Sequence, residues 1–578
     1  MSPAVTEQQD FALDQYAITS CPVALQHYCR ASTDTPTPLN IADMNGPPAR
    51  STHYAHVVRT LTTRHMGQLV DLTLVTDTTQ RTARAHAAME SGTPLIVGAQ
   101  LDTDWARHHS GRVDLLVKAD TATPTYSPVL IKDYLLLNIR ERIEGGHYLS
   151  AVSQPFFHQA VRSHHALRID SHLDDLLHLA HLHCLLETMG YATVEPWAGV
   201  IGTDHAEDVC PHPECPHKGH VITWINLTDK LIRTFSSTST PPWRKYSPLD
   251  RYAHESRFRV RVVKRALAGD EPVVRPIRTP DCDECRWWEN CRETLRDDIS
   301  FHIDHLRLDP REITTLRSLG VTTITDLGEM DVDGLLERYL PQVAHRPGGE
   351  ERLRLAAHRG RLLSAGVSLE RLTPGPIDIP SADIEIDWDI ETSSNRYAYL
   401  WGFLIHDRRD PDREPTYHSV HNFALNGPLK ELALAEEALG WLKDFVSSQV
   451  GASVLVYHYS SSEVTTVRRL SEGTGRRLRA LAWFHSWRTE HCVDLHPYVQ
   501  DNFFSVEGLG LKTVASVGAG FAWRDTDPGG LNSQHWLDEA LSCDDAERQQ
   551  AIFTRLLDYN EDDVRATWAL RGWLRSLS

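Results

Sequence analysis

Residues 384–392, IEIDWDIET, alternate apolar and acidic side chains along one short segment. This alternation predicts a β-strand that carries Asp387, Asp389 and Glu391, with Asp389 and Glu391 pointing the same way. Crowded carboxylates repel one another unless a cation neutralises them, and oxygen ligands suit Mg²⁺ or Mn²⁺. The segment therefore predicts a divalent-metal site inside a sheet, and a solvent-facing strand is the alternative.

Two later segments carry acids that could complete this site. VLVYHYSSSEVTTVRRL (454–470) predicts a strand, a short turn and a helix bearing Glu463. LLDYNEDDVRATWALRGWL (556–574) predicts a helix on which Tyr559 and Asp563, one turn apart, share a face. We expect Asp389, Glu391, Glu463 and Asp563 to converge.

The length of 578 residues allows about three or four domains, and the pattern predicts an α/β multidomain protein. Residues 1–298 alternate strands and helices, as in VDLLVKAD (113–120), YSPVLIKDYLLLNI (126–139) and the helix 173–190. Residues 299–367 predict a small helix-hairpin-helix-like segment, with short helices at 303–345 around a Leu-Gly-Val turn whose backbone amides could grip a phosphate, and a plain helical spacer is the alternative. A proline-rich linker, 368–383, precedes a compact α/β domain at 384–578.

Composition limits the function classes. The net charge of −19 argues against a chain that coats nucleic acid with its whole surface. Arginines do cluster at 251–265 and 468–488, which indicates either solvated helix faces or surfaces that contact phosphates. We find no apolar run of about 18 residues and no signal peptide, so we expect a cytoplasmic protein without a membrane span.

Three cysteines, Cys282, Cys285 and Cys291, lie close together in TPDCDECRWWENCRETL (279–295). This spacing predicts a metal site that needs a fourth ligand, and reduced surface thiols are the alternative. A second cluster, CPHPECPHKGH (210–220), has ligand types that suit zinc, but it could equally be a polar hairpin tip. It holds Cys210, His212, Cys215, His217 and His220.

The acid motifs resemble those of the DnaQ-like exonucleases, which have an RNase H fold and remove nucleotides from 3′ ends. The resemblance implies that Asp389, Glu391, Glu463 and Asp563 hold two metal ions, one activating water and one stabilising the leaving oxygen. Tyr559 would help to orient the water. The family usually has aspartate at the second motif, where this chain has Glu463. YHYSSSE is similar to the version in a bacterial branch that fuses RecB-like and RNase H-like domains.

GRVDLLV (111–117) and PVLIKDY (128–134) resemble the core of the PD-(D/E)xK nucleases, which implies a restriction-endonuclease-like domain at 1–298. Asp114 and Lys132 match two of its catalytic positions, but Leu130 stands where the family has a metal-binding acid. The family's Gln-x3-Tyr on the next helix corresponds to His178 and Leu182. We therefore expect a degenerate site, in which Asp114 and Lys132 could simply form an ion pair.

The cysteines are similar to those of RecB-type and AddB-like nucleases that carry an iron–sulfur cluster. In that family one cysteine precedes the nuclease core and three follow it in the spacing seen here. The resemblance implies a [4Fe–4S] cluster held by Cys21, Cys282, Cys285 and Cys291, with Zn²⁺ as the rival occupant and Cys29 as the weaker fourth ligand. Trp287 and Trp288 would shield the site.

Together these resemblances imply a metal-dependent nuclease that degrades nucleic acid, DNA more than RNA, at the C-terminal acids, while the N-terminal domain holds or guides the strand. Two alternatives remain open. One is a non-catalytic nucleic-acid-binding or repair scaffold with vestigial sites, and the other is an RNA exonuclease.

Overall fold

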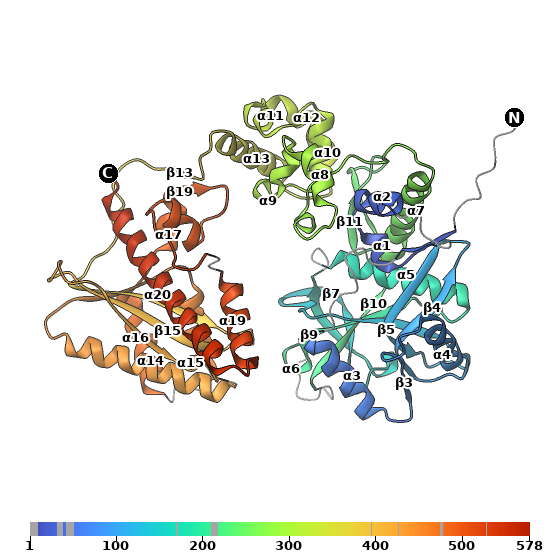
Figure 1. Cartoon of the computed structure of the whole chain (residues 1–578), viewed down its shortest axis with the longest axis horizontal. Coiled ribbons are helices and arrows are strands. Elements are labelled where there is room, and N and C mark those ends of the chain that lie inside the picture. The colour runs from blue at the N-terminus through green and yellow to red at the C-terminus, as the bar shows by residue number, and fades with distance from the viewer. Residues whose placement is uncertain are drawn as a thin grey trace. The chain divides into compact units, whose positions relative to one another are not determined.

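The computed structural model describes residues 10–31, 39–41, 51–168, 172–209, 218–394, 396–425, 427–473, 478–526 and 529–578 (Figure 1). Contacts divide the chain into two compact units. Unit 1 contains residues 1–323 and 331–354, and unit 2 contains residues 324–330 and 355–578. The chain is of the mixed α/β class, as predicted.

Unit 1 is built on a ten-stranded mixed sheet among its described residues. The order is β2-β1-β5-β6-β9-β10-β7-β8, and β4 joins β3 to β5. The strands are β1 Phe11–Leu13, β2 Leu39–Ile41, β3 Leu69–Asp71, β4 Leu95–Asp104, β5 His109–Lys118, β6 Tyr126–Ile131, β7 Leu137–Ala151, β8 Val161–Leu167, β9 Trp197–His205 and β10 His220–Asn226. A separate hairpin joins β11 Ile232–Phe235 to β12 Trp243–Tyr246.

The predicted strands at 113–120 and 126–139 do pair, as the antiparallel strands β5 and β6. The single strand expected over 126–139 is wrong, however, because β6 ends at Ile131 and β7 begins at Leu137. The carboxylate of Asp204 accepts hydrogen bonds from the backbone N–H groups of Leu136 and Leu137, at 2.7 and 3.3 Å. A side chain from β9 thus binds amides at the start of β7.

Helices cover both faces of this sheet. They are α1 Gln15–Thr19, α2 Pro22–Ala31, α3 Thr52–Arg64, α4 Thr78–Glu90, α5 Leu173–Met189, α6 Ala206–Val209 and α7 Pro248–Leu267. Helix α8, Trp288–Leu295, follows in the chain and contacts the short helical turn Ile299–His302. Helices α4 and α5 share one core with the sheet, and α3 packs into another. The helix expected over 173–190 is present, and Gly190 ends it at φ +78°, a left-handed conformation that glycine adopts without a steric penalty.

The short helices expected over 303–345 are also present. They are α9 Ile303–Leu306, α10 Pro310–Ser318, α11 Ile324–Glu329 and α12 Val332–Val343, followed by α13 Gly349–Ser364. Gly320, in the Leu-Gly-Val turn after α10, has φ +90°.

Unit 2 contains a five-stranded sheet in the order β16-β15-β14-β17-β18. Strands β14, β15 and β16 are antiparallel neighbours, whereas β17 and β18 run parallel to β14. The strands are β14 Ile384–Thr392, β15 Ala398–Asp407, β16 Thr416–His421, β17 Val454–His458 and β18 Cys492–Asp494. A separate two-stranded sheet pairs β13 Leu369–Arg371, which precedes the five-stranded sheet in the chain, with β19 Phe503–Ser505, which follows it.

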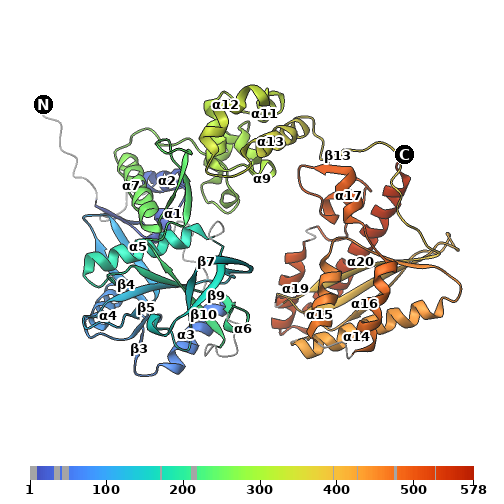
Figure 2. The ribbon, with the colours of Figure 1, turned by 180° about the vertical axis from the view of Figure 1, so that it is seen from behind.

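The helices of unit 2 lie on both faces of its sheet (Figures 1 and 2). Helices α14 Pro428–Ser448 and α16 Arg479–His491 pack with the apolar face of β14. Helix α20 Ala546–Ser576 contacts β14 and β15 from the face that carries the acids. The others are α15 Ser462–Gly473, α17 His496–Asn502, α18 Leu511–Val517 and α19 Gly530–Ser542. The alternation of β14 therefore directs its acids towards α20.

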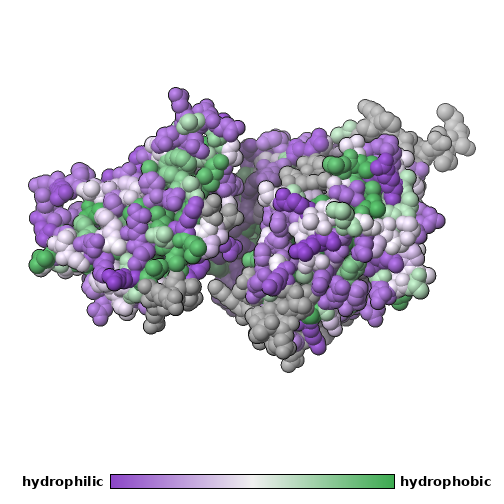
Figure 3. Space-filling model, turned by 90° about the horizontal axis from the view of Figure 1, so that it is seen from below, coloured by the Kyte–Doolittle hydropathy of each residue, from purple (hydrophilic) through white to green (hydrophobic). Residues whose placement is uncertain are grey.

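The surface seen in Figure 3 is largely hydrophilic, with apolar residues in small separate patches. Among the described helices, none combines the length and the apolar character that a membrane span requires.

Candidate active site

Four acids follow one another on the α20-facing side of β14: Glu385, Asp387, Asp389 and Glu391. Arginines of α20 neutralise the first two. Arg571 Nη2 lies 2.7 Å from Asp387 Oδ2, and Arg571 also pairs with Glu385. Arg575 Nη2 lies 2.8 Å from Glu385 Oε1. Half of the acidic stripe is therefore compensated by the protein itself.

The other two acids meet a third carboxylate instead of an arginine. Asp389, Glu391 and Asp563 each offer an oxygen, and these oxygens lie within 4.8 Å of one another. Asp563 stands eight residues before Arg571 on α20, a rise of about 12 Å in a helix, which is close to the roughly 13 Å from Asp387 to Glu391 along the strand. One helix thus brings cations to one end of the stripe and an anion to the other.

Burial raises the pKa of all three carboxyl groups. Burial and the charge of Asp563 raise the pKa of Glu391 to about 8. Burial and the charge of Glu391 raise the pKa of Asp389 well above its usual value, and burial raises that of Asp563. Three carboxylates this close together are costly to ionise without a cation. Their oxygen atoms are the ligands that hard divalent ions such as Mg²⁺ and Mn²⁺ prefer.

Neighbouring side chains fix the orientation of these acids. Asn560 Nδ2 donates to Asp389 Oδ2 at 2.7 Å, and Tyr417 Oη donates to the Asn560 carbonyl at 2.8 Å. Ser533 Oγ donates to Glu391 Oε2 at 2.9 Å, and Trp523 Nε1 donates to Asp563 Oδ1 at 2.7 Å. These four orienting residues, Tyr417, Trp523, Ser533 and Asn560, were not predicted from the sequence, although Asn560 lies directly beside Tyr559 in the motif.

Glu463 lies at the start of α15, after β17 and a short turn, as expected. It does not belong to the trio, yet its charge contributes to the raised pKa values of Asp389 and Glu391. His458 Nδ1 lies 3.6 Å from Glu463 Oε2. Burial lowers the pKa of His458, but Glu463, the charge of Asp494 and the Ser460 carbonyl together outweigh burial, so the net shift of the pKa is upwards.

Tyr559 and Lys512 lie beside Asp563. Lys512 Nζ donates to Tyr559 Oη at 2.6 Å and lies 3.4 Å from Asp563 Oδ1. Tyr559 also hydrogen-bonds Asp563. Lys512 belongs to the first turn of α18. Its ammonium group is a cation that the protein already places beside the acids.

The comparisons with known proteins concern this part of the chain. Residues 388–575 match the family model of the RNase_H superfamily. The C-terminal domain is RNase H-like. The match begins on β14 and ends on α20, so it contains Asp389, Glu391 and Asp563, and the fold is of a nuclease type. Neither the curated proteins nor the solved structures gave a match to the chain.

In unit 1, Lys132 forms an ion pair with Asp175, whereas the sequence suggested Asp114 as its partner. Its Nζ lies 2.6 Å from Asp175 Oδ1 on α5, and Asp175 Oδ2 is buried without a hydrogen bond. Asp114 Oδ2 accepts a hydrogen bond from the N–H of Ile131 at 3.0 Å. Leu130, which stands where the nuclease family has a metal-binding acid, is buried in the hydrophobic core. Asp175 was missed because it lies 43 positions after Lys132 on another element.

The helix expected to complete the N-terminal site offers no Gln-x3-Tyr pair. His178 Nε2 lies 2.9 Å from Thr19 Oγ1, and Leu182 is part of the core. Burial and the charge of Lys132 lower the pKa of His178 to about 3. Two of the α7 arginines in the cluster at 251–265 are paired with one acid, since Arg251 and Arg259 both contact Glu255.

The four cysteines of the expected cluster lie near one another. Burial raises the pKa of Cys21, hydrogen bonds from the backbone of Ala24 and Val23 lower it, and the charges of Cys282 and Cys285 raise it. Burial raises the pKa of Cys291 to about 11, and the charges of Cys21, Cys282 and Cys285 add to this. Cys29 differs, since it is fully buried in a hydrophobic core and its pKa rises to about 12.

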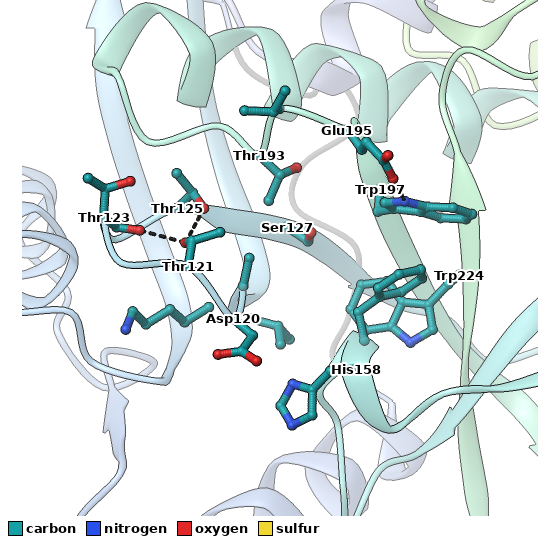
Figure 4. A pocket seen from close by; sticks show the side chains of 15 residues that line it. Asp120, Thr121, Thr123, Thr125, Ser127, His158, Thr193, Glu195, Trp197 and Trp224 are labelled. Atoms are coloured by element: carbon teal, nitrogen blue, oxygen red, sulfur yellow. Dashed lines mark hydrogen bonds between the residues drawn. The ribbon is translucent and has the colours of Figure 1, made fainter.

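Unit 1 also contains a pocket of about 360 Å³ with an aromatic end (Figure 4). Trp197, Trp224 and Phe157 line that end, and the ring centres of Phe157 and Trp197 are 4.5 Å apart. Threonines line the opposite side, where Thr121 is hydrogen-bonded to Thr123 and Thr125. This pocket lacks a group of convergent acids, so it is suited to binding a flat apolar group and not to metal chemistry.

Proposed function

We propose that the chain is a divalent-metal-dependent nuclease whose chemistry takes place at Asp389, Glu391, Glu463 and Asp563. The observation that supports this most is the trio of carboxylates within 4.8 Å of one another in an RNase H-like domain, with Glu391 and Asp563 buried and Asp389 half-buried. Such a trio is unfavourable by itself, and a divalent cation removes the cost. We further propose that the substrate is single-stranded nucleic acid, DNA more than RNA, shortened from its 3′ end.

The chain's own residues have distinct roles in this proposal. Asp389, Glu391 and Asp563 hold divalent ions, which when bound activate water and stabilise the leaving oxygen. Asn560 and Ser533 keep the first two carboxylates oriented. Tyr559, whose hydroxyl lies between Lys512 and Asp563, positions Asp563 and the water near it. Glu463, buried beside His458, supplies the fourth carboxylate.

The nuclease proposal is tested with labelled oligonucleotides and Mg²⁺ or Mn²⁺. Wild-type protein should release nucleotides from a 3′-labelled single strand and leave a descending ladder on a 5′-labelled one. Asp389→Asn should reduce the rate by more than about 100-fold, because a ligand is lost and even the loss of a group that supports a ligand costs 10–100-fold.

Asp558→Asn is the matched control, since Asp558 lies on the same helix with a half-exposed side chain that pairs with Arg524. It should retain the wild-type rate. RNA of the same sequence decides the substrate class. Absence of degradation on both DNA and RNA would contradict the proposal and favour a binding scaffold.

We also propose that unit 1 holds the strand and carries a [4Fe–4S] cluster on Cys21, Cys282, Cys285 and Cys291. Hydrogen bonds to sulfur support thiolate ligation: the N–H of Thr279 donates to Cys282 Sγ at 3.4 Å, and backbone amides of α2 serve Cys21. Arg259 Nε donates to the Ser20 carbonyl, so a guanidinium lies beside the Cys21 position. His27 of α2 stacks on Trp287, with ring centres 5.6 Å apart.

Zn²⁺ bound by the same four cysteines is the alternative occupant, and metal analysis distinguishes it from the cluster.

Anaerobic purification tests the cluster. The wild-type protein should contain iron and acid-labile sulfide in equal amounts and absorb visible light. Cys21→Ser should lose most of the iron, whereas Cys29→Ser, which changes a cysteine of the hydrophobic core, should keep it. Zinc without iron in the anaerobic wild type would contradict the cluster and favour the Cys₄ zinc site.

A further inference from the structure

Four histidines of unit 1 gather where α3 meets the ends of β9 and β10. His205 and His220 are cross-strand partners in the β9–β10 ladder. His53 and His56 lie one turn apart on α3. The ring centre of His220 is 4.2 Å from that of His205, 4.6 Å from that of His53 and 5.6 Å from that of His56. Three elements distant in sequence thus bring four imidazoles together.

Two of these imidazoles each have a buried ring nitrogen without a hydrogen-bond partner. His53 hydrogen-bonds the backbone of Gly202, and its Nε2 is buried without a hydrogen-bond partner. His220 hydrogen-bonds the backbone of Asp204, and its Nδ1 is likewise buried without a partner. His53 is only 9% exposed. A histidine that donates one N–H to a carbonyl and keeps the other nitrogen free has the arrangement typical of metal ligands.

Two carboxylates lie near these imidazoles. His205 Nδ1 lies 3.9 Å from Glu207 Oε2, and Asp133 interacts electrostatically with His53. An unprotonated imidazole nitrogen offers a lone pair to a metal ion, and the charges of Asp133 and Glu207 would offset part of a dication's charge.

We propose that His53, His56, His205 and His220 form a binding site for a transition-metal dication, with Zn²⁺ as the occupant. Imidazole nitrogen is a preferred ligand of zinc, and four such ligands make a closed tetrahedral site. With Zn–N distances of about 2.0–2.1 Å, the ring centres of a tetrahedral site lie about 5 Å apart. The three separations from His220, which are 4.2, 4.6 and 5.6 Å, bracket this value.

Binding requires a small adjustment of the rings. Among the described residues, only the acidic trio has three ligand atoms within 4.8 Å of one another, so the imidazoles must rotate to point their nitrogens at one ion. His56 and His205 are exposed and free to do so, and they also leave a path for the ion. Cys210, His212, Cys215 and His217, between α6 and β10, lie outside the described residues and are not counted as ligands.

The ion would cross-link α3 to the β9–β10 ladder. Helix α3 otherwise joins the sheet through an apolar core that includes Tyr54, Val57 and Leu61. A structural ion at its first turn adds binding free energy to the stability of unit 1. The site is separate in kind from the acidic trio, since it uses nitrogen ligands where the trio uses oxygen.

The test compares zinc binding by the full chain and by the double variant His56→Ala/His205→Ala. Both substitutions are at exposed positions, so the fold should be retained. The control is His164→Ala/His254→Ala, which removes two exposed histidines elsewhere in unit 1. After chelator treatment, zinc is titrated in competition with a chromophoric chelator, and thermal unfolding is followed with and without zinc.

Wild type and control should each bind one zinc ion more than the double variant, or bind it at least about 100-fold more tightly, and only they should gain thermal stability from it. X-ray absorption of the bound zinc should show imidazole scattering that is lost in the double variant. Equal zinc stoichiometry and affinity in all three proteins would overturn the proposal. A zinc signal from sulfur ligands alone, unchanged in the double variant, would overturn it as well.

Discussion

Gly402 lies opposite Asp389 in the β14–β15 ladder, and this glycine makes room for Asn560. A Cβ at Gly402 would come 1.7 Å from Asn560 Oδ1. The side chain of Asn560 can reach Asp389 only because position 402 has none. A residue without functional groups thus helps to set the orientation of a carboxylate of the acidic trio.

We expect Gly402→Ala to displace Asn560 and to reduce nuclease activity by about 10–100-fold, the usual cost of losing a group that supports a metal ligand. Higher concentrations of Mn²⁺ should restore part of the activity. Gly440→Ala is the control, because Gly440 lies on α14 with its nearest neighbour, Ala480 Cβ, 4.0 Å from the added carbon. Equal activity of the two variants would argue against this role of Asn560.

The raised pKa of Glu391 predicts a pH-dependent stability. The folded pKa of about 8 exceeds the ordinary 4.5, so between these values the metal-free folded protein binds more protons than the unfolded chain. The free energy of unfolding should therefore fall as pH rises through this range, by up to about 1.4 kcal/mol per unit.

Urea unfolding at a series of pH values measures this effect. Glu391→Gln should flatten the slope, and Mg²⁺ or Mn²⁺ should stabilise the wild type increasingly as pH rises. A wild-type slope equal to that of Glu391→Gln would mean that the carboxylate is not strained by its neighbours.

At the scale of elements, β14 and α20 carry opposite charges at one end of the acidic stripe and like charges at the other. Each acid of the strand meets either an arginine of the helix or the carboxylate trio, depending on its position along the stripe. Arg571 is only 2% exposed, so its charge is held in the interior by Glu385 and Asp387. This end of the stripe stabilises the fold, and the other end is left for ligands.

We expect Arg571→Met to lower the free energy of unfolding by about 3–5 kcal/mol, because two buried carboxylates lose their partner. Arg565→Met is the control, since Arg565 makes a partly exposed pair with Glu561 one turn away and should cost less than about 1 kcal/mol. Chemical denaturation of both variants at neutral pH checks this. Similar costs would show that the arginine is not needed to compensate the stripe.

At the scale of the whole molecule, the two units have different kinds of site. Unit 2 has the acidic trio. Unit 1 has the four cysteines of the proposed cluster, the four histidines of the proposed zinc site and the aromatic pocket. In the proposed division of labour, unit 1 binds the strand while unit 2 cleaves it. Stacking of a nucleobase on an aromatic side chain contributes about 1–3 kcal/mol, so a change in the pocket should affect binding and spare chemistry.

We accordingly expect Trp197→Ala to weaken single-strand binding by about 5–150-fold and to raise KM, with kcat unchanged. Fluorescence anisotropy with a labelled oligonucleotide measures the binding, and steady-state degradation measures kcat. Trp105→Ala is the control, because Trp105 is an exposed tryptophan outside the pocket. A loss of kcat alone would assign the pocket no part in holding the strand.

The sequence was sufficient for features that depend on local spacing. The alternation of IEIDWDIET predicted the strand, and the four-residue spacing of Tyr559 and Asp563 placed both on one helix. The helix at 173–190 and the strand–turn–helix around Glu463 were also predicted correctly. In each case the signal comes from residues only a few positions apart on one element.

Tertiary structure decided which distant residues meet. Nothing in the local pattern pairs Lys132 with Asp175, places Asn560 against Gly402, or brings His53 to His220. These contacts join elements that approach one another only because their apolar faces share a core. Coulomb energy and hydrogen bonding depend on distance in space, whereas the sequence records only distance along the chain.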